Sequence, residues 1–297
     1  MSPPVPQDQA SGLRRALIPP VGTRRLRVVA VTSGKGGVGK TNVAANLAVL
    51  AASRQRRVLV IDADLGLANV EIVLGLAPKF HIGHLLTEDL QLEQVLAQGP
   101  RGVRVLPAGS GIQSLSRLEP DQRMSLVNAL DALEEAFDLI IIDTGAGIGD
   151  NVLFFAGAAQ EVVLVVSPEP TSLTDAYAAL KVLSQEAGVR HFRVLVNSVA
   201  SEALAHDVFQ RLTAVSGRFL EAQVTFLGHV PRDENLGRAL MARRPVVELF
   251  PRSPASRALE HLTDALLGAP PPEGVDGGLK FLWNRLLRES SEGRRSA

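Results

Sequence analysis

A glycine-rich loop constrains this chain more than any other feature of its sequence. The residues Gly34-Lys35-Gly36-Gly37-Val38-Gly39-Lys40-Thr41 match the pattern G-x-x-x-x-G-K-[S/T]. The loop follows an apolar run, 27–33, and precedes a stretch of helical period, 40–53, which is the strand–loop–helix context that this motif requires. Glycines let such a loop turn its backbone N–H groups inward, and the helix N-terminus adds partial positive charge. The loop is therefore predicted to bind phosphate groups.

Two side chains of this loop have the chemistry to hold a triphosphate. Lys40 can reach the β- and γ-phosphates, and the Thr41 hydroxyl is a hard oxygen ligand for Mg²⁺. Lys35 is a second lysine that the phosphate cradle does not need. It could point away from its own nucleotide or be a solvated surface lysine, and the spacing leaves both interpretations open. The nucleotide contacts expected here are Gly34, Lys35, Gly36, Gly37, Val38, Gly39, Lys40, Thr41 and Asn42.

Short apolar runs alternate with helical stretches along most of the chain. The expected strands are 27–33, 57–62, 103–108, 138–143, 161–167, 192–197 and 224–230, and the expected helices are 40–53, 121–136, 172–187, 202–216, 233–242 and 256–267. Strands that are apolar on both faces and alternate with helices are typical of a covered parallel sheet. We therefore predict an α/β fold, a parallel twisted sheet flanked by helices on both faces.

Changes in composition divide the chain into five segments. Residues 1–26 are rich in Pro, Arg and Gly and are expected to form a flexible N-terminal arm before the α/β domain, 27–268. Residues 269–277 read as a Pro/Gly linker, because they contain too many helix breakers for a helix. An amphipathic helix at 278–290 and a tail at 291–297 complete the predicted organisation.

Three aspartates follow two of the expected strands. Asp62 and Asp64 end the run RVLVIDADLG, and Asp143 ends DLIIID. Ligands of open parallel sheets sit beyond the carboxyl ends of the strands, where the phosphate loop also lies. One carboxylate there can position Mg²⁺, as a Walker-B aspartate does, and another can orient the attacking water. Capping of a helix is the rival interpretation for each aspartate taken singly.

Asn197 ends the strand 192–197 at the same edge of the sheet. Its side-chain amide suits the edge of an adenine ring. A polar residue that merely ends a strand in a turn is an equally good interpretation of this position.

Composition excludes several classes of protein. Cysteine is absent, which excludes disulfides, zinc–thiolate sites and iron–sulfur clusters and fits a reducing cytosol. The net charge is zero, yet residues 1–27 carry +4 and residues 278–297 carry +3, which leaves about −7 on the middle of the chain. Basic ends on an acidic body suggest that the ends touch something anionic, although short basic tails can also serve only solubility.

The C-terminal segment has the pattern of an interfacial helix. On a helix from residue 278 to 290, an apolar face within an arc of about 140° consists of Leu279, Leu282, Trp283, Leu286 and Leu287. Basic residues occupy the other side, where Phe281 breaks the pattern. A short basic amphipathic helix behind a linker is typical of a membrane anchor, and docking on the domain's own core is the alternative.

The strings around these residues resemble a known family. GKGGVGKT, with lysine at its second position, resembles the deviant Walker A loop of the MinD/ParA ATPases, and the resemblance covers residues 27–268. A closer resemblance, to the FlhG/FleN regulators of flagellar number, is carried by the strings VIDADLGLANVEIVLGL, IIIDTGAGIGDNV and TSLTDAYAALKVL. The arm fits as well, because Asp8, Gln9, Ala10, Leu13 and Arg14 resemble the DQAxxLR motif of that family.

The resemblance implies a P-loop NTPase fold of MinD/ParA type and slow ATP hydrolysis coupled to homodimerisation, with ATP and Mg²⁺ as cofactors. It implies that Lys35 crosses to the phosphates of the partner copy and that Asp64 orients the hydrolytic water, with Lys40 as the other catalytic group. Asp62 and Asp143 would support Mg²⁺ together with Thr41, and Asn197 would contact adenine.

The same resemblance implies partners and a place in the cell. Gln9 in the arm would stimulate the GTPase FlhF, with Asp8, Leu13 and Arg14 completing the motif. Flagellar basal-body components and a flagellar transcription activator are the other implied partners. The chain would be cytoplasmic and peripherally bound to the inner, anionic membrane face through its C-terminal helix, with a polar position as one option.

Other functions on the same fold remain as alternatives. A DNA-partitioning ATPase of the ParA kind would need a basic surface, which the acidic middle of the chain disfavours, so nucleic acid is not an expected partner. Another MinD-like positioning ATPase fits the same loop. A metabolic ligase would need a substrate pocket, and a non-catalytic scaffold would not need Lys40, Thr41 and the three aspartates intact.

Overall fold

The described strands of the computed structural model form one sheet in the order β3-β4-β2-β5-β1-β6-β7-β8. The structure describes residues 26–65, 69–88, 90–109, 118–131, 136–216, 220–270 and 272. The strands are β1 (Arg27–Ser33), β2 (Val58–Ala63), β3 (Ala97–Gln98), β4 (Arg104–Leu106), β5 (Leu139–Ala146), β6 (Glu161–Val166), β7 (His191–Val199) and β8 (Gln223–Pro231). Every strand expected from the apolar runs is present, and the predicted α/β fold class is confirmed.

One edge of the sheet departs from the parallel arrangement. β3 pairs with β4 in antiparallel orientation, whereas all other neighbouring strands are parallel. The 3₁₀ turn η1 (Pro100–Gly102) joins them, and the Gly99 N–H donates to the Val103 carbonyl at 2.7 Å. The apolar pattern does not indicate β3 because a strand of two residues is too short to show a period.

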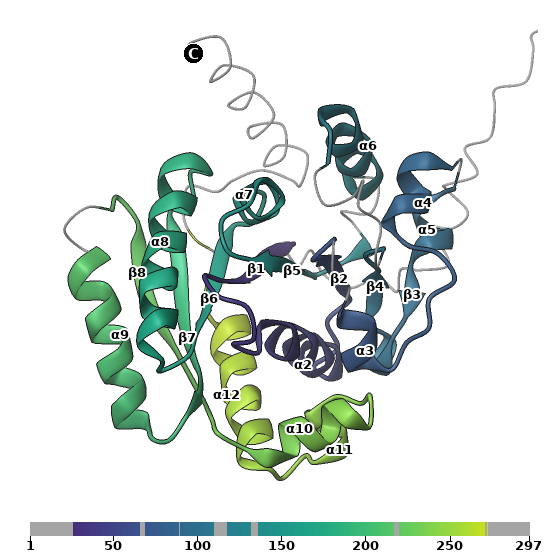
Figure 1. Ribbon diagram of the computed structural model, residues 1–297. Helices are drawn as coiled ribbons and strands as arrows, with labels where there is room; N and C mark the ends of the chain where they lie inside the picture. The colour runs from purple at the N-terminus through teal and green to yellow at the C-terminus, as the bar shows by residue number, and fades with distance from the viewer. Residues whose placement is uncertain are drawn as a thin grey trace, which may run out of the picture.

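Helices cover both faces of the sheet (Figure 1). They are α2 (Lys40–Ser53), α3 (Val70–Leu74), α4 (Ile82–Thr87), α5 (Leu92–Val95), α6 (Pro120–Asp131), α7 (Asp150–Gly157), α8 (Pro170–Glu186), α9 (Glu202–Ser216), α10 (Glu234–Met241), α11 (Val246–Leu249) and α12 (Pro254–Gly268). One core lies between the sheet and α2, α3, α10, α11 and α12, and the other lies beneath α4 to α9.

The central strands have buried residues on both of their faces. In β1, Val28 and Ala30 face one core, whereas Val29 and Val31 face the other. Because successive side chains of a strand point to opposite faces, a strand in the middle layer must be apolar throughout. This burial explains why the central strands read as continuous apolar runs in the sequence.

Several helices were not expected from the sequence. α7 contains Val152, Phe154 and Phe155, which are all buried; Gly149 precedes the helix and Gly157 is its last residue. A helix that is apolar on most sides shows no 3.6-residue period, so it is easily mistaken for loop or strand. α3, α4, α5 and α11 have at most six residues each, too few for a period to emerge.

Two predicted functional segments lie outside the described residues. They are the arm with Asp8, Gln9, Leu13 and Arg14, and the C-terminal helix with Leu279, Leu282, Trp283, Leu286 and Leu287. The expectations for both segments, and for the linker between domain and helix, therefore stay predictions.

Candidate functional site

The phosphate loop connects β1 to α2 and is shaped by two close contacts. Gly39 has a left-handed φ of 88°, and a Cβ atom there would lie 2.3 Å from the Asn197 side-chain nitrogen. A Cβ atom on Gly34 would lie 2.2 Å from the backbone of Asp175 in α8. Gly36 and Gly37 have nothing within 4 Å of such an atom, so the loop faces open space at these two residues. Packing thus demands two of the glycines, and the other two leave space for a ligand.

Lys40 and Asp143 form a buried ion pair below this loop. The Lys40 Nζ donates to Asp143 Oδ1 at 2.9 Å, and the two side chains are 8% and 0% exposed. The Thr41 hydroxyl oxygen lies 3.4 Å from the same Nζ. The second oxygen of Asp143 is buried and has no hydrogen-bond partner within the described part of the chain. Lys40 is therefore neutralised before any ligand binds, while one carboxylate oxygen stays available.

Asp62 lies beside Asp143 on the neighbouring strand, and the two residues are direct register partners of β2 and β5. Burial raises the pKa of Asp62 well above its usual value, and the nearby charge of Asp143 raises it further. The Asp62 carboxylate accepts hydrogen bonds from three backbone N–H groups, those of Asp64, Asn69 and Val70, each at 3.2 Å. Both of its oxygens already hold the turn after β2, so Asp143 is the better oriented oxygen ligand for a cation.

Burial also raises the pKa of Asp143, against the opposing charge of Lys40. The negative charge of Asp64 also raises the pKa of Asp143, so a third carboxylate lies close to this pair. Its side chain is half-buried, and its Oδ1 lies 3.6 Å from the position of a Cβ on Gly145, just after the buried part of β5. The three aspartates therefore do meet below the phosphate loop, as the strand-end rule predicts.

The donor set fits a magnesium ion held mainly by phosphate and water. Among the residues that the structure describes, no three His, Cys, Asp or Glu side chains gather as a metal site. The free Asp143 oxygen and the Thr41 hydroxyl are hard oxygen ligands on one side of the loop. Mg²⁺ usually keeps several waters and takes one or two protein ligands together with substrate phosphates, so these two groups suffice.

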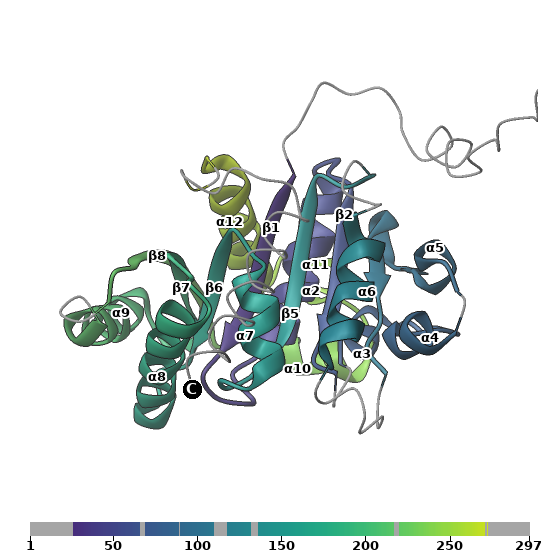
Figure 2. The same cartoon turned by 90° about the horizontal axis from the view of Figure 1, so that it is seen from above.

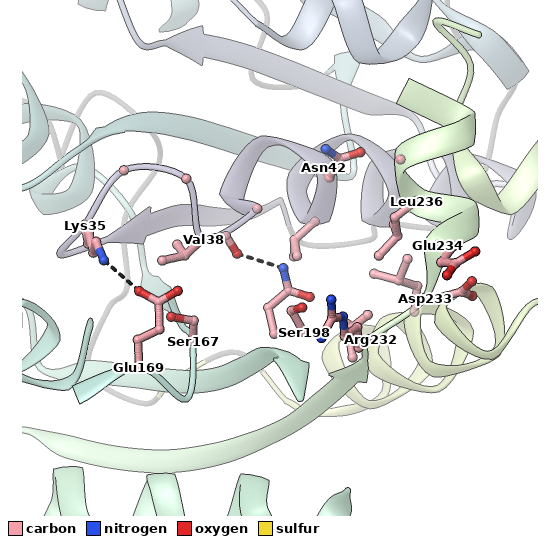
Figure 3. A pocket seen from close by; sticks show the side chains of 18 residues that line it. Lys35, Val38, Asn42, Ser167, Glu169, Ser198, Arg232, Asp233, Glu234 and Leu236 are labelled. Carbon is pink, nitrogen blue, oxygen red and sulfur yellow. Dashed lines mark hydrogen bonds and ion pairs between the residues drawn. The ribbon is translucent and has the colours of Figure 1, made fainter. Parts of the chain in front are cut away.

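Lys35 points toward Glu169 at the start of α8 (Figure 3). Its Nζ donates to Glu169 Oε2 at 2.7 Å and to the Thr171 hydroxyl at 3.1 Å. The Lys35 side chain is 37% exposed and Glu169 is 61% exposed, so the pair lies at the surface. Sequence reasoning missed Glu169 and Thr171, although both follow β6 at the edge where the aspartates were found.

A pocket of about 780 Å³ opens beside the loop (Figure 3). Its lining comes from the loop, from the ends of β6, β7 and β8, and from α2, α10 and α12: Lys35, Gly36, Gly37, Val38, Gly39, Asn42, Val43, Ser167, Glu169, Asn197, Ser198, Val230, Arg232, Asp233, Glu234, Leu236, Gly237 and Leu259. The volume suits a small-molecule ligand. Lys40, Asp62, Asp64 and Asp143 do not line it, so the ion pair and the three aspartates lie outside the pocket.

Two buried polar atoms of the pocket lining have no hydrogen-bond partner in the described part of the chain. The Asn197 side-chain nitrogen donates to the Val38 carbonyl at 2.7 Å, but its Oδ1 has no hydrogen-bond partner among the described residues. The buried Ser167 hydroxyl likewise has no hydrogen-bond partner among these residues. Leaving buried polar atoms unpaired costs free energy, so these atoms point to a polar ligand. Ser167, Ser198 and Arg232 are pocket residues that sequence reasoning did not find.

Comparison with known proteins identifies relatives over most of the chain. The sequence model of one protein family, the CobQ/CobB/MinD/ParA nucleotide binding domain, matches residues 29–246. The antiactivator FleN of Pseudomonas aeruginosa is 45% identical over 268 residues, which cover 90% of this chain and 96% of FleN. The flagellum site-determining protein YlxH of Helicobacter pylori is 29% identical over 266 residues, 88% of this chain and 90% of YlxH.

A solved structure agrees with the fold. The septum site-determining protein MinD of Pyrococcus horikoshii, complexed with Mg-ADP, superimposes with a TM-score of 0.68 at 26% identity. The match covers 84% of this chain and 99% of that protein. The phosphate loop, the ion pair and the pocket thus occur on a fold that holds a magnesium nucleotide in that relative.

Proposed function

This chain belongs to the CobQ/CobB/MinD/ParA nucleotide-binding family and, within it, to the FleN/FlhG flagellar regulators, and we propose that its ATPase cycle is a dimerisation switch. ATP would join two copies, and hydrolysis would separate them. The dimer would bind the membrane and the monomer would return to the cytosol, and this cycle would regulate the number and placement of flagella. The buried Lys40–Asp143 pair below an open phosphate loop is the observation that carries the proposal.

We assign the nucleotide to the loop and the adjoining pocket. The open side of Gly36 and Gly37 would receive the phosphates, and Lys40 would move from Asp143 to the β- and γ-phosphate oxygens. Thr41 and the freed Asp143 would hold Mg²⁺, which supplies charge neutralisation of the phosphates when bound. The unpaired Asn197 Oδ1 could accept from an adenine amino group in the pocket.

Hydrolysis in this scheme requires a positioned water and a second copy of the chain. Asp64 is half-buried beside the Asp143 centre, which suits a carboxylate that orients the attacking water. Lys35 would leave Glu169 and reach the phosphates bound by the partner copy. Because the Lys35–Glu169 pair is exposed, its separation costs little, about 1 kcal/mol or less.

The membrane and partner roles rest on the terminal segments and on the relatives. No helix within the described ranges has the length and apolarity to cross a membrane. We propose that the segment 278–290 binds the membrane surface peripherally and that Gln9 in the arm stimulates the GTPase FlhF. FleN is an antiactivator and YlxH determines a flagellum site, which supports a transcription activator and basal-body components as further partners.

Light scattering combined with vesicle sedimentation tests the switch. With ATP and Mg²⁺ we expect a dimer that sediments with anionic vesicles, and with ADP a monomer that stays in the supernatant. Lys35→Ala should bind ATP without dimerising, and deletion of 278–297 should dimerise without sedimenting. A wild-type chain that has the same mass and the same sedimentation with both nucleotides would show that it is not a nucleotide-driven switch.

Replacement of Gln9 tests the arm separately. A Gln9→Ala chain should keep its own ATP hydrolysis, because the residues assigned to the nucleotide and to hydrolysis all lie between positions 34 and 197, yet it should stimulate FlhF GTPase activity less. An unchanged FlhF rate would refute the role of the arm and leave the switch itself untouched.

A further inference from the structure

The strand β5 has a bulge just after Asp143. In the register of β1 and β5, Val31 opposes Asp143 and Ser33 opposes Ala146, so a single residue of β1, Thr32, faces two residues of β5. A bulge bends its strand and re-aims the side chains beside it, and bulges are common next to active sites. The backbone of β5 is therefore redirected where the strand reaches the candidate site.

Two buried threonines lie at this bulge, on the face of the sheet opposite Asp143. Thr32 follows Ala30 by two residues and Thr144 follows Ile142 by two residues, and both of these apolar residues belong to the core beneath α4 to α9. Because the side chains of a strand alternate between its faces, the two threonines lie on one side, where α7 packs against β1 and β5 (Figure 2). Both threonines are 0% exposed, so their hydroxyls have to find hydrogen-bond partners inside the protein.

The two hydroxyls form a short chain of hydrogen bonds that ends on the backbone. The hydroxyl oxygens of Thr144 and Thr32 lie 2.8 Å apart, and the Thr144 oxygen lies 2.9 Å from the carbonyl oxygen of Gly145. The carbonyl oxygen of Val31 is farther from Thr144, at 3.3 Å. Each hydroxyl has one proton, so both close contacts are satisfied when Thr32 donates to Thr144 and Thr144 donates to Gly145. This chain fixes the orientation of the planar peptide group between Gly145 and Ala146.

The exit segment of β5, as we call Gly145–Gly147, is fastened at its other end as well. The Gly147 N–H donates to the Ser33 carbonyl at 2.8 Å. The Ser33 hydroxyl in turn donates to the carbonyl of Lys35, inside the phosphate loop, at 2.9 Å. The exit segment is therefore tied at both ends to β1 and, through Ser33, to the loop itself.

The exit segment borders the place to which the proposed function assigns the terminal phosphate. It directly follows Thr144, and Asp64 Oδ1 lies 3.6 Å from the position of a Cβ on Gly145. Burial ends here, since Thr144 is buried and Ala146 is exposed. Successive backbone N–H groups in a turn of this kind are donors that a phosphate oxygen can reach.

We propose that Thr144 is a positioning residue for ATP hydrolysis. Through its contacts with Thr32 and with the Gly145 carbonyl, it holds the exit segment where backbone N–H groups of that segment donate to the γ-phosphate. The inference rests on the ATP site proposed above, and it adds a residue that touches neither the nucleotide nor the cation. Because ADP has no γ-phosphate, the effect of Thr144 distinguishes ATP from ADP.

Hydrogen-bond donors that are already held in place stabilise the reacting phosphoryl group without first having to be ordered. In the reaction, the water oxygen forms a bond to the γ-phosphorus, the bond to the bridging oxygen breaks with its electron pair left on ADP, and a water proton passes to the phosphate that forms. The exit segment contacts the γ-phosphate before and during this step. A loosened exit segment therefore weakens ATP binding and slows hydrolysis.

Thr144→Val tests the proposal, because it removes the hydroxyl and keeps a β-branched side chain of similar size. Thr144→Ser keeps a hydroxyl and is the rescue variant. Thr263→Val is the matched control, since Thr263 is also buried and donates to a backbone carbonyl, that of Leu259 in α12, at 2.8 Å. For each full-length chain, calorimetry measures the affinity for ADP and for a non-hydrolysable ATP analogue, both with Mg²⁺. Phosphate release measures hydrolysis, and thermal unfolding is followed without nucleotide.

We expect Thr144→Val to bind the ATP analogue about tenfold more weakly and to hydrolyse ATP about tenfold more slowly, the effect of losing one neutral hydrogen bond. Its affinity for ADP should be unchanged. Thr144→Ser should regain most of both losses. Thr263→Val should unfold at a lower temperature, yet it should bind both nucleotides and hydrolyse ATP as the wild type does.

Equal losses of affinity for ADP and for the ATP analogue in Thr144→Val would overturn the proposal, because they would show a purely structural role. Unchanged binding and hydrolysis would overturn it as well. If Thr144→Val does not fold, Thr32→Val decides, because it removes the other hydroxyl of the pair: a selective loss of affinity for the ATP analogue supports the proposal, and equal or absent losses contradict it. A wild-type chain that binds neither nucleotide would refute the proposed ATP site and this inference together.

Discussion

Lys40 donates to Asp143 at 2.9 Å below the phosphate loop, and both side chains are almost entirely buried. The pair sets a carboxylate directly against a buried lysine. It also leaves one Asp143 oxygen without a partner. A nucleotide with its cation can satisfy both groups at once, because phosphate attracts the lysine and Mg²⁺ attracts the carboxylate.

The stability of the nucleotide-free chain should depend on this pair. Asp143→Asn leaves the Lys40 charge buried and uncompensated, so the free energy of unfolding should fall by about 3 kcal/mol. Urea unfolding without nucleotide measures the change. Asp207→Asn, which breaks the exposed Asp207–Arg211 pair, is the matched control and should cost less than about 1 kcal/mol. Equal losses of unfolding free energy in the two variants would mean that the buried pair stabilises the chain no more than the exposed pair does.

Gly39 should tolerate a methyl group poorly. Gly39→Ala combines a left-handed φ with a Cβ that displaces the Asn197 amide, so we expect a loss of about 1–3 kcal/mol in the ligand-free chain. Gly36→Ala is the control, because nothing lies within 4 Å of the added atom. Thermal unfolding without nucleotide separates the two variants. If both unfold at the same temperature, the contact between loop and β7 does not constrain Gly39.

Asp64 should matter for turnover and not for binding. Asp64→Ala should bind ATP and hydrolyse it roughly 100-fold or more slowly, the usual loss when a positioned acid–base group is removed. The ATP-bound dimer should then persist in light scattering. The rate of ATP hydrolysis is measured as the rate of phosphate release. A monomeric variant with full activity would exclude Asp64 as the group that orients the water.

The start of α4 should make stability depend on pH. His81 Nδ1 accepts from the Gly83 N–H at 3.1 Å, which requires a neutral ring, and burial lowers the pKa of His81 below 6.5, with His84 acting in the same direction. The unfolded chain therefore binds the proton first as pH falls through about 6.5. The contribution of His81 to the free energy of unfolding should be fully present above that pH. It should decrease as the pH falls further, until His81 is protonated in the folded chain as well.

His81→Asn tests this pH dependence. An asparagine oxygen caps a helix at any of these pH values, so the variant should lose less stability than the wild type between about pH 7.5 and 5.5. Urea unfolding at the two pH values measures the difference. Parallel losses in both chains would assign the acid sensitivity to other groups.

Local patterns were enough to predict the sheet, its main helices and the phosphate loop. The central strands are apolar on both faces because each packs between two cores, and that burial appears directly in runs such as 27–33 and 138–143. The convergence of Asp62, Asp64 and Asp143 was also predictable, because parallel strands end at one edge. α7 and β3 could not be predicted in this way, because an all-apolar helix and a two-residue strand show no hydrophobic period.

The sequence by itself determined that a loop of glycines lies between a strand and a helix, the arrangement whose N–H groups suit a phosphate. Only the tertiary structure decided which side chains face each other there: that Asp143 and not Asp62 keeps a free oxygen, that Lys35 lies against Glu169, and that Ala269 returns to Arg27. The contacts of Lys40, Lys35 and Arg27 join residues from 103 to 242 positions apart, and strand order and register set such distances without leaving any mark in a local pattern.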